Sequence, residues 1–331
     1  MGINMLDLKK SNAQTVLWKL RDLRAATIKE LAQLTGLSFA TVANILAGFV
    51  EEGQVLLGEM QSGTGGRPSQ TYLFNAEFSH LLAVSVQVKD GKNVILACVG
   101  NLYEEIVWRT EQYLSEIELS SLEAVVELAL ESYPSISILA FSLPGVEHQG
   151  VILTIDYEDL EGVMFSQHFY DKHGLPVLVE NDVNAALYGY SKMINSCSVN
   201  VGIYFPRYFN PGAAILVDGK VLKGAHGFAG EVRHLPIDID WPTLDYDDPE
   251  MVGAAIVKLI KVFGYIVNPD HLILYGDFFT ESVRQVIELS LPKHATHDLI
   301  PSPVYTNDLE SHIMTGLMAQ AVEIYKSTKK P

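Results

Sequence analysis

Two successive runs of the same kind fill residues 80 to 328, and this repetition limits the fold more than any other feature of the chain. The first run opens with short strands in LLAVSVQVKDGKNVILACVGNLYEEIVW, and hairpins are expected at Asp90-Gly91 and Gly100-Asn101. It continues with the helix LSSLEAVVELALESY, the buried strands SISILAFSLPG and PVLVEN, and the helix DVNAALYGYSKM. Hairpin strands followed by alternating helices and strands indicate a mixed sheet covered by helices.

The second run repeats this order. It begins with the strands SVNVGIYFP and GAAILVDGKVLKG, and it ends with a helix over residues 250–264, the strand HLILYG and a last helix over residues 308–328. The repetition predicts an α/β body of two similar lobes with a cleft between them. We place the first lobe at residues 77–190 and the second at residues 191–331, and we assign the last helix to the second lobe.

Residues 1–76 form a separate head with a different pattern. NAQTVLWKLRDL has the apolar spacing of an amphipathic helix, and a second helix follows at TIKELAQLTG. Thr27 and Glu30 predict a capping box at the start of the second helix, and Gly36 is expected to end it. A third helix is predicted in LSFATVANILAGFVEEG, with Ser38 as its N-cap.

The third helix is the candidate for contact with DNA. Its apolar residues at helical spacing should face the core, so that Ala40 and Asn44 point outward and Thr41 lies on the flank. Two short helices joined by a glycine turn are typical of a helix-turn-helix. The alternative is a three-helix bundle used only for packing, since residues 38–48 contain no Lys or Arg.

The segment after the third helix favours DNA binding. QVLLGEMQSGTGGRPSQTYLFN predicts two strands, at residues 54–60 and 69–75, joined by a glycine-rich loop. Such a hairpin is a wing, and Arg67 beside Pro68 can enter an A·T-rich minor groove. A flexible hairpin tip without a role is the alternative. The residues predicted to contact DNA are Ser38, Ala40, Thr41, Asn44, Gly65, Gly66, Arg67 and Pro68.

The distribution of charge separates the head from the body. The whole chain has a formal net charge of −17. Residues 1–75 hold seven Lys and Arg against six Asp and Glu, a net charge of +1, which leaves −18 for residues 76–331. A strongly acidic body is unsuited to binding nucleic acid over its surface, so any DNA should meet the head.

Other features of the composition narrow the class of protein. No apolar stretch is long enough to span a bilayer, because the best candidate, residues 254–267, carries Lys258 and Lys261. The start MGINMLDLKK does not have the shape of a signal peptide. Only two cysteines occur, Cys98 and Cys197, which excludes a disulfide framework and a metal site built from cysteines. We therefore expect a cytoplasmic protein without membrane contact.

Four short motifs, in this order and spacing, resemble the ROK family (repressors, open reading frames and kinases), specifically its repressor branch. They are GGRP after the predicted helix-turn-helix, LPG at 143–145, VENDVNAA at 179–186 and DGKVLKGAHGFAGEVRH at 218–234. The resemblance covers nearly the whole chain. It implies a winged helix-turn-helix followed by a two-lobed body of the actin/hexokinase (ribonuclease H-like) type.

The resemblance also implies a sugar pocket. In sugar-phosphorylating relatives an Asn-Asp pair binds the sugar and the Asp takes the proton of the hydroxyl, and these positions match Asn181 and Asp182. Glu231 and His234 match further sugar contacts, and Gly145 matches a backbone contact. We assign ligand binding to these five residues and assign no catalytic residue. Capping of the following helix by Asp182 is the alternative role for that residue.

The chain departs from active kinases where the nucleotide should bind. The first phosphate loop is replaced by SVQVKDG, the second by GIYFPRYFNPGAA, and the adenosine-side glycines by YGDFF. Bulky side chains and an added carboxylate at these places are unsuited to holding phosphate. Of the ligands of the family's structural zinc, only His234 remains. We therefore expect neither a cofactor nor a metal.

Together these features predict a DNA-binding transcriptional regulator of carbohydrate metabolism, expected to be a repressor, without enzymatic activity. Its expected partners are a double-stranded DNA operator and a sugar or sugar phosphate effector, and its expected assembly is a homodimer or homotetramer. Two alternatives stay open. The chain could be an ATP-dependent sugar kinase with a regulatory head, or its body could only dimerise the head without binding a small molecule.

Overall fold

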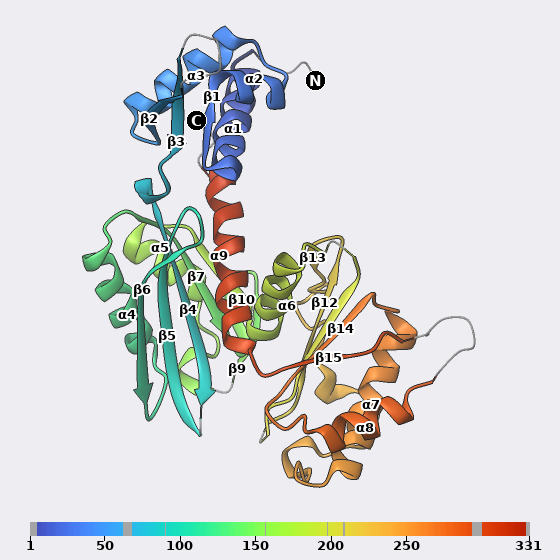
Figure 1. The fold of residues 1–331 in the computed structure, drawn as a ribbon. Helices are drawn as coiled ribbons and strands as arrows, with labels where there is room; N and C mark the ends of the chain where they lie inside the picture. Colours follow the sequence, from blue (N-terminus) through green and yellow to red (C-terminus); the bar gives the residue numbers. More distant parts are fainter. Residues whose placement is uncertain are drawn as a thin grey trace.

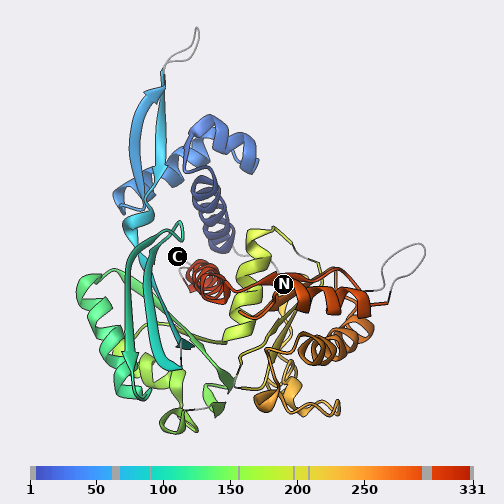
Figure 2. The same cartoon turned by 60° about the horizontal axis from the view of Figure 1, so that its bottom comes forward.

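A computed structural model describes residues 5–61, 68–89, 91–155, 157–196, 198–207, 209–292 and 300–328. The head contains α1 (Met5–Leu23), β1 (Ala25–Thr27), α2 (Ile28–Thr35), α3 (Phe39–Glu51), β2 (Val55–Gln61) and β3 (Ser69–Phe74). The three strands form an antiparallel sheet in the order β1-β3-β2. The β2–β3 hairpin extends away from the body (Figure 2). The winged helix-turn-helix predicted from the sequence is therefore present.

Local capping explains where α2 and α3 begin. The Thr27 hydroxyl accepts a hydrogen bond from the Glu30 amide, and the Glu30 carboxylate accepts from the Thr27 amide, as the capping box requires. The bond from the Thr27 backbone, followed by that from its hydroxyl, lowers the pKa of Glu30. Gly36 ends α2 with φ 71°, a conformation that glycine adopts without strain.

The angle between α2 and α3 fits a helix-turn-helix. The two helices are bent by 116° at the break between them. No single helix among the described residues is both long and apolar enough to span a membrane, and α2 and α3 pass that test only as this bent pair.

The body contains two five-stranded sheets of the same design. The first has the order β10-β7-β4-β5-β6 and the second the order β13-β12-β11-β14-β15. In each, three antiparallel strands precede two parallel ones. The strands of the first sheet are β4 (His80–Lys89), β5 (Lys92–Asn101), β6 (Ile106–Leu114), β7 (Ile136–Leu143) and β10 (Val177–Asn181). Those of the second are β11 (Asn200–Tyr204), β12 (Gly212–Val217), β13 (Lys220–Val221), β14 (His271–Tyr275) and β15 (Val304–Thr306).

Helices cover both sheets and also lie between them. α6 (Asp182–Met193) and α9 (Leu309–Thr328) separate the two sheets, with α9 against the first and α6 against the second (Figure 1). α4 (Leu119–Ser132) and α5 (Phe165–His173) cover the outer face of the first sheet. α7 (Pro249–Ile266) and α8 (Glu281–Ser290) cover the outer face of the second. A small hairpin of β8 (Gly145–His148) and β9 (Val151–Ile155) follows β7. The predicted two-lobed body is thus observed.

The last helix corrects one expectation. We assigned it to the second lobe, but α9 returns to the first sheet and continues upward to the head (Figure 1). Its buried apolar residues belong to one core that joins the head, the first sheet, α6 and the inner face of the second sheet. At the upper end, the ring of Tyr325 lies edge-on to Trp18 of α1, with centroids 6.2 Å apart. The apolar face of α9 is buried only in this position. The predicted boundaries at residues 76 and 190 stay predictions.

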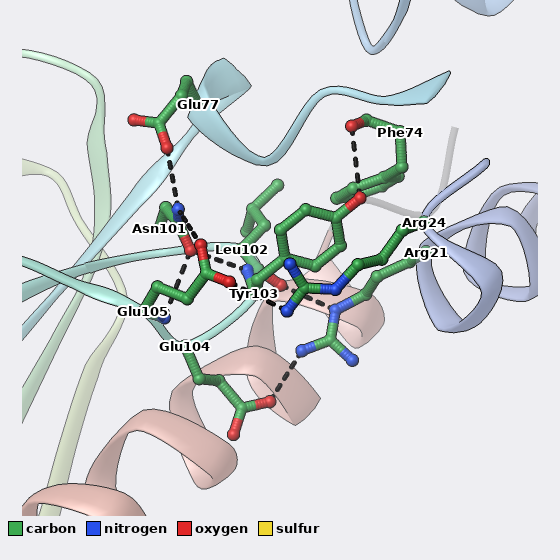
Figure 3. A network of polar contacts seen from close by, with 9 residues as sticks. All are labelled: Arg21, Arg24, Phe74, Glu77, Asn101, Leu102, Tyr103, Glu104 and Glu105. Atoms are coloured by element: carbon green, nitrogen blue, oxygen red, sulfur yellow. Dashed lines mark hydrogen bonds and ion pairs between the residues drawn. The ribbon is translucent and has the colours of Figure 1, made fainter. Parts of the chain in front are cut away.

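A polar network completes the joint between head and body (Figure 3). Arg21 donates from Nε to the carbonyl oxygen of Leu102, 2.6 Å away, and its Nη2 lies 2.6 Å from Oε1 of Glu104. Arg24 pairs with Glu105 at 2.8 Å and lies over the ring of Tyr103. Head and body are therefore connected by both side-chain bonds and a shared apolar core.

Candidate functional site

The exposed side of α3 carries several of the residues predicted to contact DNA. Ala40 and Asn44 are exposed, as predicted from the helical spacing, and Thr41 is half-buried. Ser38 is the N-cap of α3, because its hydroxyl oxygen accepts a hydrogen bond from the Thr41 amide at 3.2 Å. The hydroxyls of Ser38 and Thr41 also bond to each other, at 2.9 Å. These two residues therefore fix the start of α3, while Ala40 and Asn44 face outward.

Part of the predicted wing contact lies outside the described residues. Gly65, Gly66 and Arg67 belong to that part of the chain, so their roles stay predictions. Pro68 is described, is exposed, and leads directly into β3.

A hollow of about 470 Å³ lies beside α3 on the head surface. Sequence reasoning did not predict it, although the position of Phe39 directly after the N-cap, outside the buried face, is a signal for an outward side chain. Phe39 is 58% exposed there. The hollow is lined by Thr27, Ile28, Lys29, Phe39, Ala40, Ala43, Ser69 and Gln70. It thus brings the start of α2, the first half of α3 and the start of β3, at the loop end of the wing, together.

In the body, Asn181 ties the candidate pocket to α6. It is the N-cap of α6, and its Oδ1 accepts hydrogen bonds from the amides of Val183 and Asn184 at 3.0 and 3.2 Å. Its Nδ2 donates to the carbonyl oxygen of Gly145 at 3.2 Å. A Cβ on Gly145 would lie 2.4 Å from the carbonyl oxygen of Thr154, so only glycine fits at this position. The structure therefore brings Asn181 and Gly145 together.

Asp182 does not cap α6, which corrects the alternative role considered for it. It occupies the first helical position, where its Oδ1 accepts from the Val183 amide at 2.8 Å. The pKa of Tyr204, at the end of β11, is raised mainly by burial and secondly by the negative charge of Asp182. Because Tyr204 belongs to the second sheet, Asp182 lies where the two lobes meet.

Glu231 and His234 lie at a short 3-10 helix of the second lobe, Val232–His234. His234 is its last residue, and Glu231 directly precedes its first. Arg233 interacts with both: its Nε lies 3.6 Å from Glu231 Oε2 and donates to His234 Nε2 at 3.2 Å. His234 is exposed and Glu231 is half-buried. This segment is fixed to β12, since the amide of Ala213 donates to the carbonyl oxygen of Gly230.

β12 connects these residues to the other half of the candidate pocket. A Cβ on Gly212, its first residue, would lie 3.1 Å from a methyl group of Val183 on α6. The two predicted groups therefore lie on neighbouring elements. In this conformation, however, Asn181 is hydrogen-bonded to Gly145 and His234 to Arg233. The polar side chains on each side of the candidate pocket are therefore bonded to residues of their own lobe.

Contacts between the lobes close the cleft beside Asn181. Lys223 Nζ, from the second lobe, lies 2.9 Å from Oε2 of Glu180, a carboxylate whose side chain is 4% exposed. The second Glu180 oxygen accepts from Asn184 Nδ2 at 3.1 Å. His226 lies edge-on to His148 of β8, with ring centroids 5.6 Å apart. Sequence reasoning missed these contacts because they join residues on separate lobes.

The remaining space at this place is small. The cavity next to Asn181 has a volume of about 10 Å³, roughly what one water molecule requires. It is lined by Leu143, Gly145, Glu147, Ile152, Ile155, Val179, Glu180 and Asn181. All of these residues belong to the first lobe, so the cavity lies within that lobe and not between the two lobes.

Two of the stretches expected to replace the nucleotide loops contribute side chains that contact one another in the second lobe. Phe205 is buried against Trp241, with ring centroids 5.6 Å apart, and against Phe278 at 6.3 Å. Arg207 Nε lies 3.0 Å from a carboxylate oxygen of Asp277. Within the described part of the chain, no three His, Cys, Asp or Glu residues are grouped so that they could hold a metal ion.

Comparisons with known proteins agree on one family. The model of the ROK family matches residues 87–255, slightly more than half of the chain. The xylose repressor of Caldicellulosiruptor bescii is 27% identical over 246 residues, which are 72% of this chain and 61% of that protein. The chain thus spans less than two thirds of the length of the curated relatives it matches.

Solved structures extend the likeness to the fold. A ROK family transcriptional regulator, described as a homologue of the Escherichia coli Mlc protein, has a TM-score of 0.66 at 17% identity, covering 98% of this chain and 99% of that one. A ROK family glucokinase from Streptomyces griseus, in complex with glucose and AMPPNP, has a TM-score of 0.59 at 13% identity and covers 74% of this chain and 100% of its own. The predicted combination of a hexokinase-like body and an N-terminal winged helix-turn-helix fold is confirmed.

Proposed function

Because the chain belongs to the ROK family, we propose that it is a DNA-binding transcriptional repressor of carbohydrate metabolism, acting in the cytoplasm. The observation that carries this proposal is the head: α2 and α3 meet at 116°, Ala40 and Asn44 are exposed on the outward side of α3, and a wing follows directly. The acidic body repels DNA, so the head is the part of the molecule that DNA can approach. The name of the xylose repressor supports the same function.

The proposed effector is a sugar or sugar derivative that binds between the lobes. Asn181, Asp182 and Gly145 would form one side of its site, and Glu231 and His234 the other. Because Lys223 of the second lobe is paired with the buried Glu180 next to Asn181, binding between the lobes requires the lobes to separate and this pair to open. A sugar that binds the open state more tightly than the closed state shifts the population toward the open state.

We further propose that the body no longer transfers phosphate. Phosphoryl transfer depends almost entirely on the positioning of nucleotide and metal. The stretches expected to replace the nucleotide loops contribute Phe205, Phe278 and the Arg207–Asp277 pair, and these side chains are engaged with one another, which supports this part of the proposal. The competing function is an ATP-dependent sugar kinase, and Asp182 at the position of the catalytic base is the observation that favours it.

DNA binding is tested with the full chain and promoter fragments of its own operon, by fluorescence anisotropy at low and moderate salt. We expect binding that weakens as salt rises, because phosphate contacts release counterions. Arg67→Ala should weaken it by roughly tenfold or more, the loss expected for one groove contact. Arg207→Ala, on the far lobe, is the matched control. Failure to bind any fragment at either salt concentration would contradict the proposal.

Kinase activity is tested by sugar-dependent release of ADP with pentoses, hexoses and amino sugars. We expect none. Release that Asp182→Asn abolishes and Asp159→Asn, an exposed substitution elsewhere on the first lobe, leaves intact would establish the kinase instead.

Effector binding is tested by thermal shift with the same sugars and their phosphates. We expect one class to raise the unfolding temperature in the wild type and to fail in Asn181→Ala. If none of these compounds raises the unfolding temperature, the proposed role of the body becomes dimerisation of the head, in a homodimer or homotetramer.

A further inference from the structure

The outward side of α3 is apolar over its first half. Phe39, Ala40 and Ala43 all line the hollow beside the helix, and Asn44 is the next exposed polar residue. No charged residue of either sign occurs from Ser38 to Gly48. Phe39 stays 58% exposed in the structure, although aromatic side chains of this size are normally buried for much of their surface.

This surface offers few of the usual means of reading bases. In the major groove, guanine is most often recognised by Arg or Lys, and cytosine by Asp or Glu, and residues 39–50 of α3 include none of these; Glu51, the last residue of the helix, is its one charged residue. Asn is the usual partner of adenine, and Asn44 is exposed. The C5-methyl group of thymine is the one apolar group that bases present in that groove, and Ala and Phe are among its usual contacts.

The hollow has the arrangement that such contacts need. Its apolar lining consists of Phe39, Ala40, Ala43 and the half-buried Ile28, so methyl groups entering it would meet carbon atoms. Lys29 is exposed at its edge, where an ammonium group can reach a phosphate. An apolar lining beside a cation, on a near-neutral head above a strongly acidic body, suits DNA better than an acidic or apolar protein.

We infer that α3 recognises its operator through thymine methyl groups held against Phe39, Ala40 and Ala43, with Phe39 as the residue that determines this specificity. The inference rests on the proposed DNA-binding function and deepens it. Burial of one methyl group is worth about a fourfold change in affinity, from the usual transfer free energy of a CH₂ group.

The test replaces thymine by deoxyuridine, which removes the methyl group and keeps every hydrogen-bonding group. A duplex is first selected from a random-sequence library by the full chain, and each thymine is then replaced in turn. We expect an affinity loss of about fourfold at two or more thymines of each half-site. Phe39→Ala should bind the thymine and the corresponding deoxyuridine duplex equally. Leu34→Ala, which removes an exposed apolar side chain of α2 outside the hollow, should keep the preference for thymine.

The outcomes separate this inference from the proposed function. If a duplex is selected and no thymine replacement weakens binding of the wild type, the inference is wrong while DNA binding stands. If no duplex is selected at all, the proposed function fails first, and the hollow is then left for a protein partner or a second copy of the chain. The wild-type comparison with deoxyuridine decides the matter even if Phe39→Ala does not fold.

Discussion

The joint between head and body and the joint between the two lobes are built from different contacts. At the first, long side chains meet a turn: Arg21 and Arg24 bond to residues 102–105 (Figure 3). At the second, backbone meets backbone, because Gly189 of α6 and Gly316 of α9 allow the two helices to touch. The polar contacts of the head can be lost one at a time, but Trp18 and Tyr325 also join the head to α9 through a shared apolar core. Two backbones in contact cannot shift without opening their crossing. The lobes are therefore expected to pivot about the crossing of α6 and α9, and the polar contacts of the head joint to open before its apolar core.

The largest effect is expected from Gly316→Ala at the crossing. A Cβ there would lie 2.0 Å from the carbonyl oxygen of Ala185, so the helices must move apart. We expect the free energy of unfolding to fall by about 3 kcal/mol, as measured by urea denaturation. Gly48→Ala is the control, because its Cβ on α3 would meet nothing within 4 Å, and it should gain roughly 0.5–1 kcal/mol. Equal stability of the two variants would show that the crossing is not tight.

The head joint should respond less strongly. Arg21→Ala removes a hydrogen bond to Leu102 and an ion pair with Glu104, whose side chains are only 14% and 31% exposed in the pair. We expect a loss of about 2–3 kcal/mol, with faster amide hydrogen exchange in residues 101–105. Arg24→Ala should have a much smaller effect, because Arg24 and Glu105 are both largely exposed. A larger loss of unfolding free energy in Arg24→Ala than in Arg21→Ala would show that Arg24 contributes more to this joint.

Loss of the ion pair across the cleft should open the lobes. Lys223→Met leaves the buried Glu180 carboxylate without its cation, although opening lets water reach it and limits the loss to about 1–2 kcal/mol. We expect a larger radius of gyration by X-ray scattering. Glu180→Gln in the same chain should restore both stability and compactness. An unchanged radius in Lys223→Met would mean that other contacts hold the cleft closed.

The smallest effect concerns pH and the lobe joint. His312 of α9 is buried between Tyr275 of β14 and Tyr190 of α6, and burial lowers its pKa, while the charge of Asp308 acts in the opposite direction. The unfolded chain, with an ordinary His pKa of 6.5, then binds the proton more readily, so stability falls as the pH drops below about 6.5.

The expected loss is at most about 1.4 kcal/mol for each unit by which the pKa is lowered. Denaturation curves at neutral and mildly acidic pH measure it. His312→Asn should reduce this dependence and leave the part due to His173, whose pKa burial also lowers, while His271→Gln, at the start of β14, should leave the whole dependence in place. An unchanged dependence in His312→Asn would assign the effect to another group.

Much of the fold could be predicted from short stretches of sequence. The capping box of Thr27 and Glu30, the N-cap at Ser38 and the glycine end at Gly36 all depend on residues within four positions of one another. The wing strands were predicted at residues 54–60 and 69–75 and occur at Val55–Gln61 and Ser69–Phe74. Hydrophobic spacing and caps are local properties, which is why these predictions succeeded.

The candidate pocket was less predictable. Asn181 and Asp182 could be singled out, but the sequence did not reveal that Asn181 caps α6 and holds Gly145, or that Lys223 reaches across to Glu180. The hollow at Phe39 was also missed, because it needs α2, α3 and the wing in their folded positions. Each of these features joins elements that are far apart in the sequence, and the sequence spacing does not show that they lie close together in the fold.

The sequence by itself determined the repeated lobes, the lack of Lys and Arg in residues 38–48 and the separation of a near-neutral head from an acidic body, since periodicity and charge are properties of the residues alone. Only the tertiary structure decided that α9 leaves the second lobe, crosses α6 at two glycines and reaches Trp18 in the head. A helix with an apolar face can be buried against any apolar partner. Which partner it takes is set by the packing of the whole chain, where backbones fit closely enough to exclude water.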